Sequence, residues 1–255
     1  MYLGIDAGFS AQGRSTGLCL IDPFAKNPVR SIHVRTAETT AAITDLLSSR
    51  APIAASIDGP LLLSNSGLRF TTANRYRECE RMLSGGIFQK RCKPGATNTP
   101  RGFALHRQAT SIANFLLRTF PGIIIHEAFP NAFLGVMLPD SAFRVPIRRG
   151  IKSDVFWENC VNGTTLMRRL LNRLFPGTLA IRLLKAATKL NDHDERAAFV
   201  CALVARGSET QANFMVGNGA DGAISLPPAN CIQPWALDEL RIRCGPTGNT
   251  GAILA

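Results

Sequence analysis

The feature that most constrains the fold of this chain is a series of short apolar segments at its N-terminus. Residues 2–6, 16–22 and 29–35 each have the length of a strand, and polar turns separate them at hairpin spacing. We expect an antiparallel meander. An amphipathic segment over 38–49 then predicts a helix, and the apolar run 53–58 predicts a fourth strand. Since a strand reached through a helix lies parallel to its partner by a right-handed crossover, we expect the fourth strand beside the first.

Two of these expected strands end in an aspartate. Asp6 closes the apolar part of the run LGIDAG, and Asp58 does the same in SIDGP. A carboxylate at a strand end is costly to bury without a partner. The glycines nearby let a ligand or an ion approach closely. Two such carboxylates on neighbouring strands can hold a divalent metal ion between them.

The rest of the chain predicts more helices and one further buried strand. That strand covers residues 122–127 and ends at Glu127. The pattern predicts an α/β fold in one domain over 1–255, with a five-stranded mixed sheet of order 3-2-1-4-5 flanked by helices. Insertions are expected at about 60–101 and 131–190. Helical segments are expected over 74–83, 103–119, 131–137, 153–174, 179–189 and 197–205, before a last short strand within 217–226.

The acidic strand ends point to one place. In a sheet of this order, the carboxyl ends of strands one, four and five share an edge, and the first turn of the helix that carries Asp194 can reach it. Carboxylates that converge there repel one another, which raises at least one pKa in the metal-free protein. Oxygen ligands with few histidines suit Mg²⁺ or Mn²⁺, and two such ions about 3.5–4 Å apart can cleave phosphodiesters. Taken singly, each of Asp6, Asp58, Glu127 and Asp194 also fits a turn, a helix cap or a solvated acid.

The net charge of +11 and the pI near 9.9 favour an anionic partner, most simply nucleic acid. The positive charge gathers in residues 69–107 and 144–185. A solvated basic surface that binds nothing is the alternative. The side chains singled out as contacts for a phosphate backbone are Arg77, Arg101, Arg149 and Lys152, and His193 is a further candidate for substrate binding or proton transfer beside Asp194.

Seven cysteines without a C-x-x-C pair argue against a disulfide framework and a zinc ribbon, and for a reducing compartment. No apolar stretch has the length of a membrane span, and no basic leader precedes an apolar region, so we expect a soluble cytoplasmic protein. The glycine-rich run 217–222 superficially suggests a phosphate loop. Because a strand rather than a helix follows it, we interpret it as a hairpin turn.

The run LGIDAG, followed by TGL at 16–18, is similar to the first strand pair of the ribonuclease H-like superfamily. The whole chain resembles the family of predicted ribonuclease H-like nucleases known as domain of unknown function 429. The stretches that carry this resemblance are SIDGP at 56–60, RECE at 77–80, HEAFP at 126–130, HD at 193–194 before AAFVCALVA, and DGAISLP at 221–227.

The resemblance implies a metal-dependent nuclease with Asp6, Asp58 and an acid of the final helix as ligands, and Glu127 as a further acid. One departure is Ala197, which stands where another acid is expected. That leaves Asp194 as the helix ligand, with Asp192 and Glu195 as substitutes.

We therefore expect hydrolysis of nucleic-acid phosphodiesters with Mg²⁺ or Mn²⁺. Asp6 would bridge two ions, Asp58 and Asp194 would complete their shells, and Glu127 would bind a metal or orient water. Two alternatives stay open. One is an ATPase or phosphotransferase of the actin and sugar-kinase type, and the other is a catalytically inactive nucleic-acid-binding module.

Overall fold

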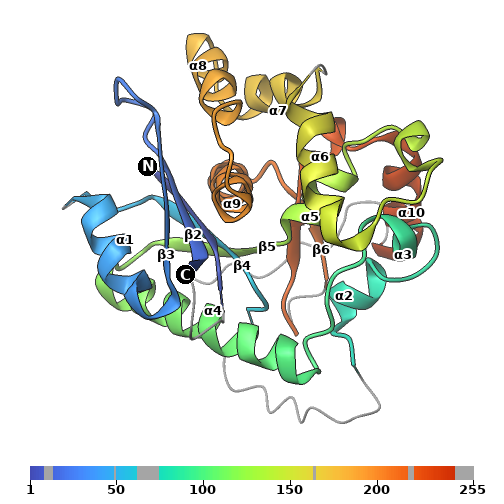
Figure 1. The fold of residues 1–255 in the computed structure, drawn as a ribbon, viewed down its shortest axis with the longest axis horizontal. Coiled ribbons are helices and arrows are strands. Elements are labelled where there is room, and N and C mark those ends of the chain that lie inside the picture. The colour runs from blue at the N-terminus through green and yellow to red at the C-terminus, as the bar shows by residue number, and fades with distance from the viewer. Residues whose placement is uncertain (9–13, 49, 62–74, 163–164, 218–220, 245–255) are drawn as a thin grey trace.

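The computed structural model describes residues 1–8, 14–48, 50–61, 75–162, 165–217 and 221–244. These residues form an α/β fold in which helices flank one mixed sheet of seven strands (Figure 1). The strand order is β3-β2-β1-β4-β5-β7-β6. The strands are β1 (Tyr2–Asp6), β2 (Arg14–Ile21), β3 (Val29–Arg35), β4 (Ala54–Asp58), β5 (Ile124–Ala128), β6 (Phe214–Val216) and β7 (Ile224–Leu226).

The first half of the sheet has the expected connections. Strands β1, β2 and β3 form an antiparallel meander, and β4 lies parallel to β1 after the crossover through a helix. Strand β5 lies parallel to β4. The expected count of five strands is wrong, because β7 pairs in parallel with β5 and β6 pairs antiparallel with β7. That antiparallel pair confirms a hairpin around the glycine-rich run, of which residues 218–220 lie outside the described part.

The helices form two layers on the sheet and a group at one end of it (Figure 1). Helix α9 (His193–Glu209) crosses one face, under α5 (Pro130–Gly135), α6 (Lys152–Val161), α7 (Leu166–Leu174) and α8 (Thr178–Ala187). Helices α1 (Thr39–Leu47) and α4 (Pro100–Thr119) cover the other face. At the β6–β7 end lie α2 (Glu78–Met82), α3 (Phe88–Arg91) and α10 (Pro234–Cys244). Short 3₁₀ turns occupy Thr36–Glu38, Asp140–Phe143, Arg149–Ile151 and Ala229–Cys231.

Helix α9 lies unusually close to the sheet because two glycines face it. A Cβ atom on Gly4 of β1 would sit 1.9 Å from the Ala198 carbonyl oxygen, and one on Gly17 of β2 would sit 2.0 Å from the Asp194 carbonyl oxygen. Both obstacles are backbone atoms, so a side chain at either position would displace the helix. Gly17 therefore lets the first turn of α9 rest directly on the sheet beside Asp6.

The cysteines and the apolar segments of the chain are placed as follows in the structure. The seven cysteines are all free thiols, and Cys19 and Cys201 lie fully buried in the core as expected for small apolar residues. Within the described ranges, no helix combines the length and the apolar character that crossing a membrane requires.

Candidate metal centre

The two strand-end aspartates are direct neighbours in the sheet. Asp6 of β1 pairs in register with Asp58 of the parallel strand β4, and on its other side with Gly17 of β2. Gly17 in turn pairs with His33 of β3. Because register partners project from the same face of a sheet, these side chains form one row on the face that α9 covers. The expected convergence of Asp6 and Asp58 thus follows directly from the crossover.

The first turn of α9 adds a third carboxylate to this row. Asp192 is the N-cap of the helix, since its Oδ1 atom accepts hydrogen bonds from the backbone N–H groups of Asp194 at 2.9 Å and Glu195 at 3.1 Å. The possibility that Asp194 merely caps the helix is therefore wrong. Its side chain instead reaches the sheet and hydrogen-bonds with Asp6.

Two of these carboxyl groups, those of Asp6 and Asp58, bind their protons more tightly than an isolated aspartate does. Burial raises the pKa of Asp6 well above its ordinary value, and the charges of Asp58 and Asp194 raise it further. Burial and the charge of Glu127 raise the pKa of Asp58 to about 7, against a hydrogen bond from Asp6 that lowers it. Within the described ranges, no lysine or arginine forms an ion pair with Asp6 or Asp58. Protons compensate the crowding where a cation could do so.

Glu127 lies close to this group but belongs to a different one. Strand β5 ends one residue later than expected, and Ala128 rather than Glu127 pairs with Asp58. Glu127 pairs with Ile57 and faces the opposite side of the sheet. Its oxygens accept hydrogen bonds from the guanidinium group of Arg77 at 2.8 and 2.5 Å and from the Leu61 N–H at 2.8 Å. The expected convergence of four acids is thus reduced to three aspartates.

Arg77 is likewise not placed to contact a phosphate backbone, which corrects the prediction made for it. Its side chain is buried, with only 3 % of the residue exposed. Besides Glu127, its guanidinium donates to Glu80 Oε1 at 2.9 and 3.0 Å and to Thr97 Oγ1 at 3.1 Å. A buried arginine between two carboxylates is a structural link, here between α2 and β5.

The other basic candidates are dispersed. Lys152 donates to the backbone carbonyls of Lys90 at 3.2 Å and Arg91 at 3.0 Å, so it joins the start of α6 to the end of α3. Arg101 is exposed in the first turn of α4. Arg149 belongs to a 3₁₀ turn, and its side chain lies outside the described part of the structure.

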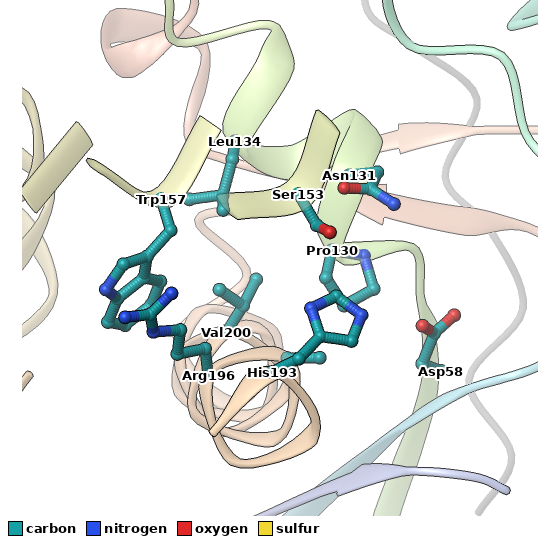
Figure 2. A pocket seen from close by; sticks show the side chains of 10 residues that line it. Asp58, Pro130, Asn131, Leu134, Ser153, Trp157, His193, Arg196 and Val200 are labelled. Atoms are coloured by element: carbon teal, nitrogen blue, oxygen red, sulfur yellow. The ribbon is translucent and has the colours of Figure 1, made fainter. Parts of the chain in front are cut away.

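A pocket opens beside Asp58, between α9 and the helices α5 and α6 (Figure 2). His193 and Asp58 line it together with Asn131 and Ser153. Ala197 also lines it, at the position where an acid was expected from the family resemblance. His193 is exposed and lies in this pocket, next to the three aspartates.

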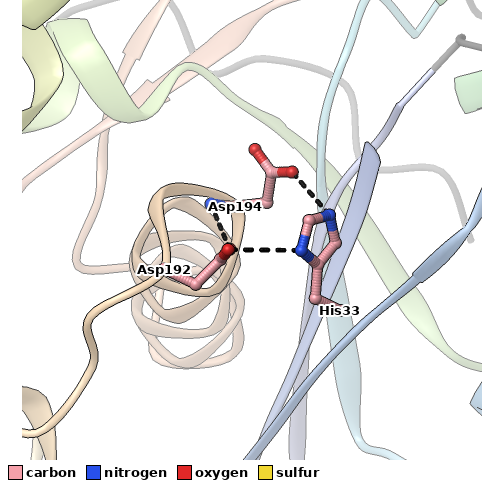
Figure 3. Close-up of side chains that lie close together, drawn as sticks. All are labelled: His33, Asp192 and Asp194. Carbon is pink, nitrogen blue, oxygen red and sulfur yellow. Dashed lines mark hydrogen bonds and ion pairs between the residues drawn. The ribbon is translucent and has the colours of Figure 1, made fainter. Parts of the chain in front are cut away.

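The sequence reasoning missed His33. Its ring lies between two carboxylates of α9, with Nδ1 at 3.2 Å from Asp192 Oδ2 and Nε2 at 2.8 Å from Asp194 Oδ2 (Figure 3). These three side chains offer ligand atoms close enough together to share one metal ion. The register of the expected hairpins contained the signal, since it places residue 33 opposite Gly17 and in the row of Asp6.

The donors in this region fit a divalent cation. Asp6, which interacts with both Asp58 and Asp194, supplies together with them the oxygen ligands that Mg²⁺ and Mn²⁺ prefer. The raised pKa values of Asp6 and Asp58 are those of acidic groups crowded without a counter-charge. Comparisons of the chain with protein-family models, with curated proteins and with solved structures find no match in any of the three.

Proposed function

We propose that the protein is a metal-dependent nuclease that hydrolyses nucleic-acid phosphodiester bonds with Mg²⁺ or Mn²⁺. One observation carries the proposal. Asp6 and Asp58 are register partners on adjacent parallel strands, and Asp194 reaches Asp6 from the first turn of the helix that crosses them. Such a set of carboxylates is costly without a cation and is suited to hold one or two.

Each aspartate has a role in this proposal. Asp6, between the other two, would bridge the ions, while Asp58 and Asp194 would each complete one shell. Bound there, the cations would stabilise charge on a phosphate group and lower the pKa of a water molecule. Glu127, held by Arg77 on the other face, would act through its charge on Asp58 rather than as a ligand. His193 would meet the substrate at the mouth of the pocket beside Asp58.

We further propose that the chain belongs to the ribonuclease H-like superfamily, and within it to the domain of unknown function 429 family. The sheet order supports this, since it begins β3-β2-β1-β4-β5 with an antiparallel meander followed by two parallel strands. The acids then lie at the carboxyl ends of β1 and β4 and at the start of α9. The strands β7 and β6 would be an extension of that core.

The charge of the chain supports nucleic acid as the substrate class. A net charge of +11 favours a polyanion. Phosphate contacts by lysine and arginine release counterions, so binding should weaken steeply as salt rises. Because Arg77 is buried and Lys152 is bonded to α3, the contacts would come from exposed side chains such as Arg101.

Cleavage of mixed DNA and RNA oligonucleotides with Mn²⁺, Mg²⁺ or EDTA tests the proposal. Wild type should cleave only with metal, and Asp6→Asn should lose at least about a hundredfold of that activity, since a positioned charged group at a reacting centre is worth this much. Asp238→Asn is the matched control, because Asp238 is 72 % exposed in α10 and has only a 3.8 Å ion pair with Arg241.

The outcomes separate the alternatives. Equal activity in wild type and Asp6→Asn would identify a contaminant and overturn the proposal. A thermal shift with ATP and Mg²⁺, without cleavage, would favour the phosphotransferase. Salt-sensitive oligonucleotide binding that neither metal nor Asp6→Asn alters would favour an inactive binding module.

A further inference from the structure

The ring of His33 is held in a defined orientation by the cap of α9. Asp192 is fixed because its Oδ1 atom accepts two backbone N–H groups of the helix. Its second oxygen, Oδ2, then faces His33 Nδ1 at 3.2 Å. A carboxylate can only accept, so Nδ1 carries a hydrogen. Of the two neutral tautomers of the ring, the one that fits is therefore the one with its lone pair on Nε2.

The lone pair on Nε2 faces a second carboxylate. Asp194 Oδ2 lies 2.8 Å away, but the contact lacks the alignment of a hydrogen bond. Nε2 is buried, and no other group in the described residues bonds to it. Two lone pairs at this distance repel, so the arrangement calls for a positive charge between them. The separation is also close to the roughly 3 Å between adjacent ligand atoms around an ion with bonds of about 2.1 Å.

We propose that His33 Nε2 is a nitrogen ligand of the cation that Asp194 binds, and that Asp192 is the outer partner that orients the ring. A carboxylate that holds a ligating histidine through its other nitrogen is a common arrangement in metal sites. This inference rests on the proposed function only in that it shares Asp194 with the proposed nuclease centre. It concerns the identity of the metal: a nitrogen donor among carboxylates favours Mn²⁺ and later transition metals over Mg²⁺.

The competing explanation is a salt bridge. A protonated His33 could join Asp192 and Asp194 and thereby fasten the start of α9 to β3, without any metal. The ring would then contribute to stability alone, and metal binding at the aspartates would not involve nitrogen. The two explanations differ in what Mn²⁺ experiences.

Titration with Mn²⁺ followed by electron paramagnetic resonance, on the full chain without nucleic acid, separates them. Pulsed spectra of wild type should show coupling of Mn²⁺ to a ¹⁴N nucleus. His33→Ala should remove that coupling and raise the Kd for Mn²⁺ by about tenfold to a hundredfold, the range known for disturbed metal shells, with a change of less than about threefold for Mg²⁺. His106→Gln is the control, because it removes an imidazole on α4, which covers the opposite face of the sheet, and it should alter neither quantity.

The failure of this inference and that of the nuclease proposal can be told apart. Mn²⁺ binding with nitrogen coupling but no cleavage of any oligonucleotide would retain the His33 site and reject the nuclease. Metal-dependent cleavage without nitrogen coupling in wild type would do the opposite. Coupling that persists in His33→Ala, or wild type that binds no Mn²⁺, would also overturn the inference. The wild-type spectrum decides the question even if His33→Ala does not fold.

Discussion

Two groups of ionisable side chains lie at the same end of β4 and β5, on opposite faces of the sheet. The group around Arg77 and Glu127 is buried, the group around Asp6 is half-buried, and the two differ in how their charges are compensated. Around Glu127, the guanidinium of Arg77 lies between two carboxylates, and hydrogen bonds reach both oxygens of Glu127. Around Asp6, the carboxylates of Asp58 and Asp194 both lie close to the Asp6 carboxyl group, and no arginine or lysine is paired to Asp6 or Asp58 within the described ranges.

The difference separates structural from functional use of charge. The Arg77 group is neutralised within the chain, so it holds the inserted helix α2 against the sheet and needs no ligand. The Asp6 group is neutralised only by protons, so it costs stability that a bound cation would return. Acidic side chains that crowd together without a paired lysine or arginine are characteristic of ligand sites. The two groups should therefore respond oppositely when a charge is removed.

Removal of Arg77 should have the largest effect. Arg77→Ala leaves Glu80 and Glu127 buried without their cation, and such a loss typically costs about 3–5 kcal/mol of folding free energy. Urea unfolding at pH 7 measures it. Arg81→Ala, an exposed arginine in the same helix α2, should change the stability by less than about 0.5 kcal/mol. Similar small losses in both variants would show that the Arg77 group does not hold the fold.

His126 is a third case, in which burial keeps an ionisable side chain uncharged. It precedes Glu127 in β5 and faces the other side of the sheet. Burial lowers the pKa of its ring to about 4, so the folded protein keeps it neutral, whereas the unfolded chain protonates near pH 6.5. Between these values the unfolded state binds more protons, and stability falls as the pH falls. From pH 7 to pH 5 this ring should contribute a loss of about 2 kcal/mol.

The contribution of His126 is measured as a difference, because other groups titrate over the same range. Urea unfolding of wild type and His126→Gln at pH 7 and pH 5 isolates it, and the variant should lose about 2 kcal/mol less than wild type. Parallel pH dependence of the two proteins would contradict a buried neutral imidazole.

Removal of a charge from the Asp6 group should stabilise the metal-free protein. A carboxyl group whose pKa is raised by folding lends stability at low pH, which is lost as the pH rises through the raised value. In EDTA at pH 8, Asp6→Asn should therefore be more stable than wild type, by more than the roughly 0.5 kcal/mol within which ordinary surface substitutions fall. At pH 5 the gain should shrink.

Mn²⁺ completes this experiment. Mn²⁺ should raise the melting temperature of wild type, because an ion that binds the folded state and not the unfolded state stabilises the folded state. The melting temperature of Asp6→Asn should stay nearly unchanged, because this variant lacks the bridging carboxylate. Thermal unfolding with Mn²⁺ and with EDTA measures both effects. An Asp6→Asn protein that is less stable than wild type in EDTA would place Asp6 with the structural charges.

The contrast between the two groups was only half visible in the sequence. The pairing of Asp6 with Asp58 followed from local patterns, since hairpin spacing and one crossover place the two strands side by side. Glu127 was misassigned because β5 extends by one residue, and with a period of two a single residue changes the face. Glu127, which accepts a hydrogen bond from Arg77, is 50 positions away from it in the chain, so no local pattern reveals the pair.

His33 and strand β6 were not predicted, for other reasons. The sequence around His33 in β3 contains no motif that marks a metal ligand. Its neighbours Asp192 and Asp194 are about 160 positions away in the chain, so no local pattern links them to His33. Strand β6 has three residues, too few for an alternating apolar pattern to be recognised, whereas β7 lies within the strand expected at 217–226. Long-range packing, rather than local propensity, thus decides which side chains would be the third and fourth donors of the proposed metal centre.

The smallest effect should distinguish two acids within one helical turn. Asp192 has its Oδ1 atom bonded to two backbone N–H groups, whereas Asp194 adds charge to the crowded row. In EDTA at pH 8, Asp192→Ala should therefore cost about 1 kcal/mol, as the loss of an N-cap usually does. Asp194→Ala should change the stability by less than about 0.5 kcal/mol, because relief of repulsion offsets its lost interaction with the helix dipole.

With Mn²⁺ present, the ranking of these two variants should reverse. Asp194→Ala should lose most of the metal-induced rise in melting temperature, while Asp192→Ala should retain a part of it, since Asp192 acts on the cation only through the ring of His33. Thermal unfolding of both variants in EDTA and in Mn²⁺ gives the four values required. If the two variants behave alike in both conditions, the first turn of α9 holds a single acidic cap, and the distinction between satisfied and unsatisfied charge does not extend to this helix.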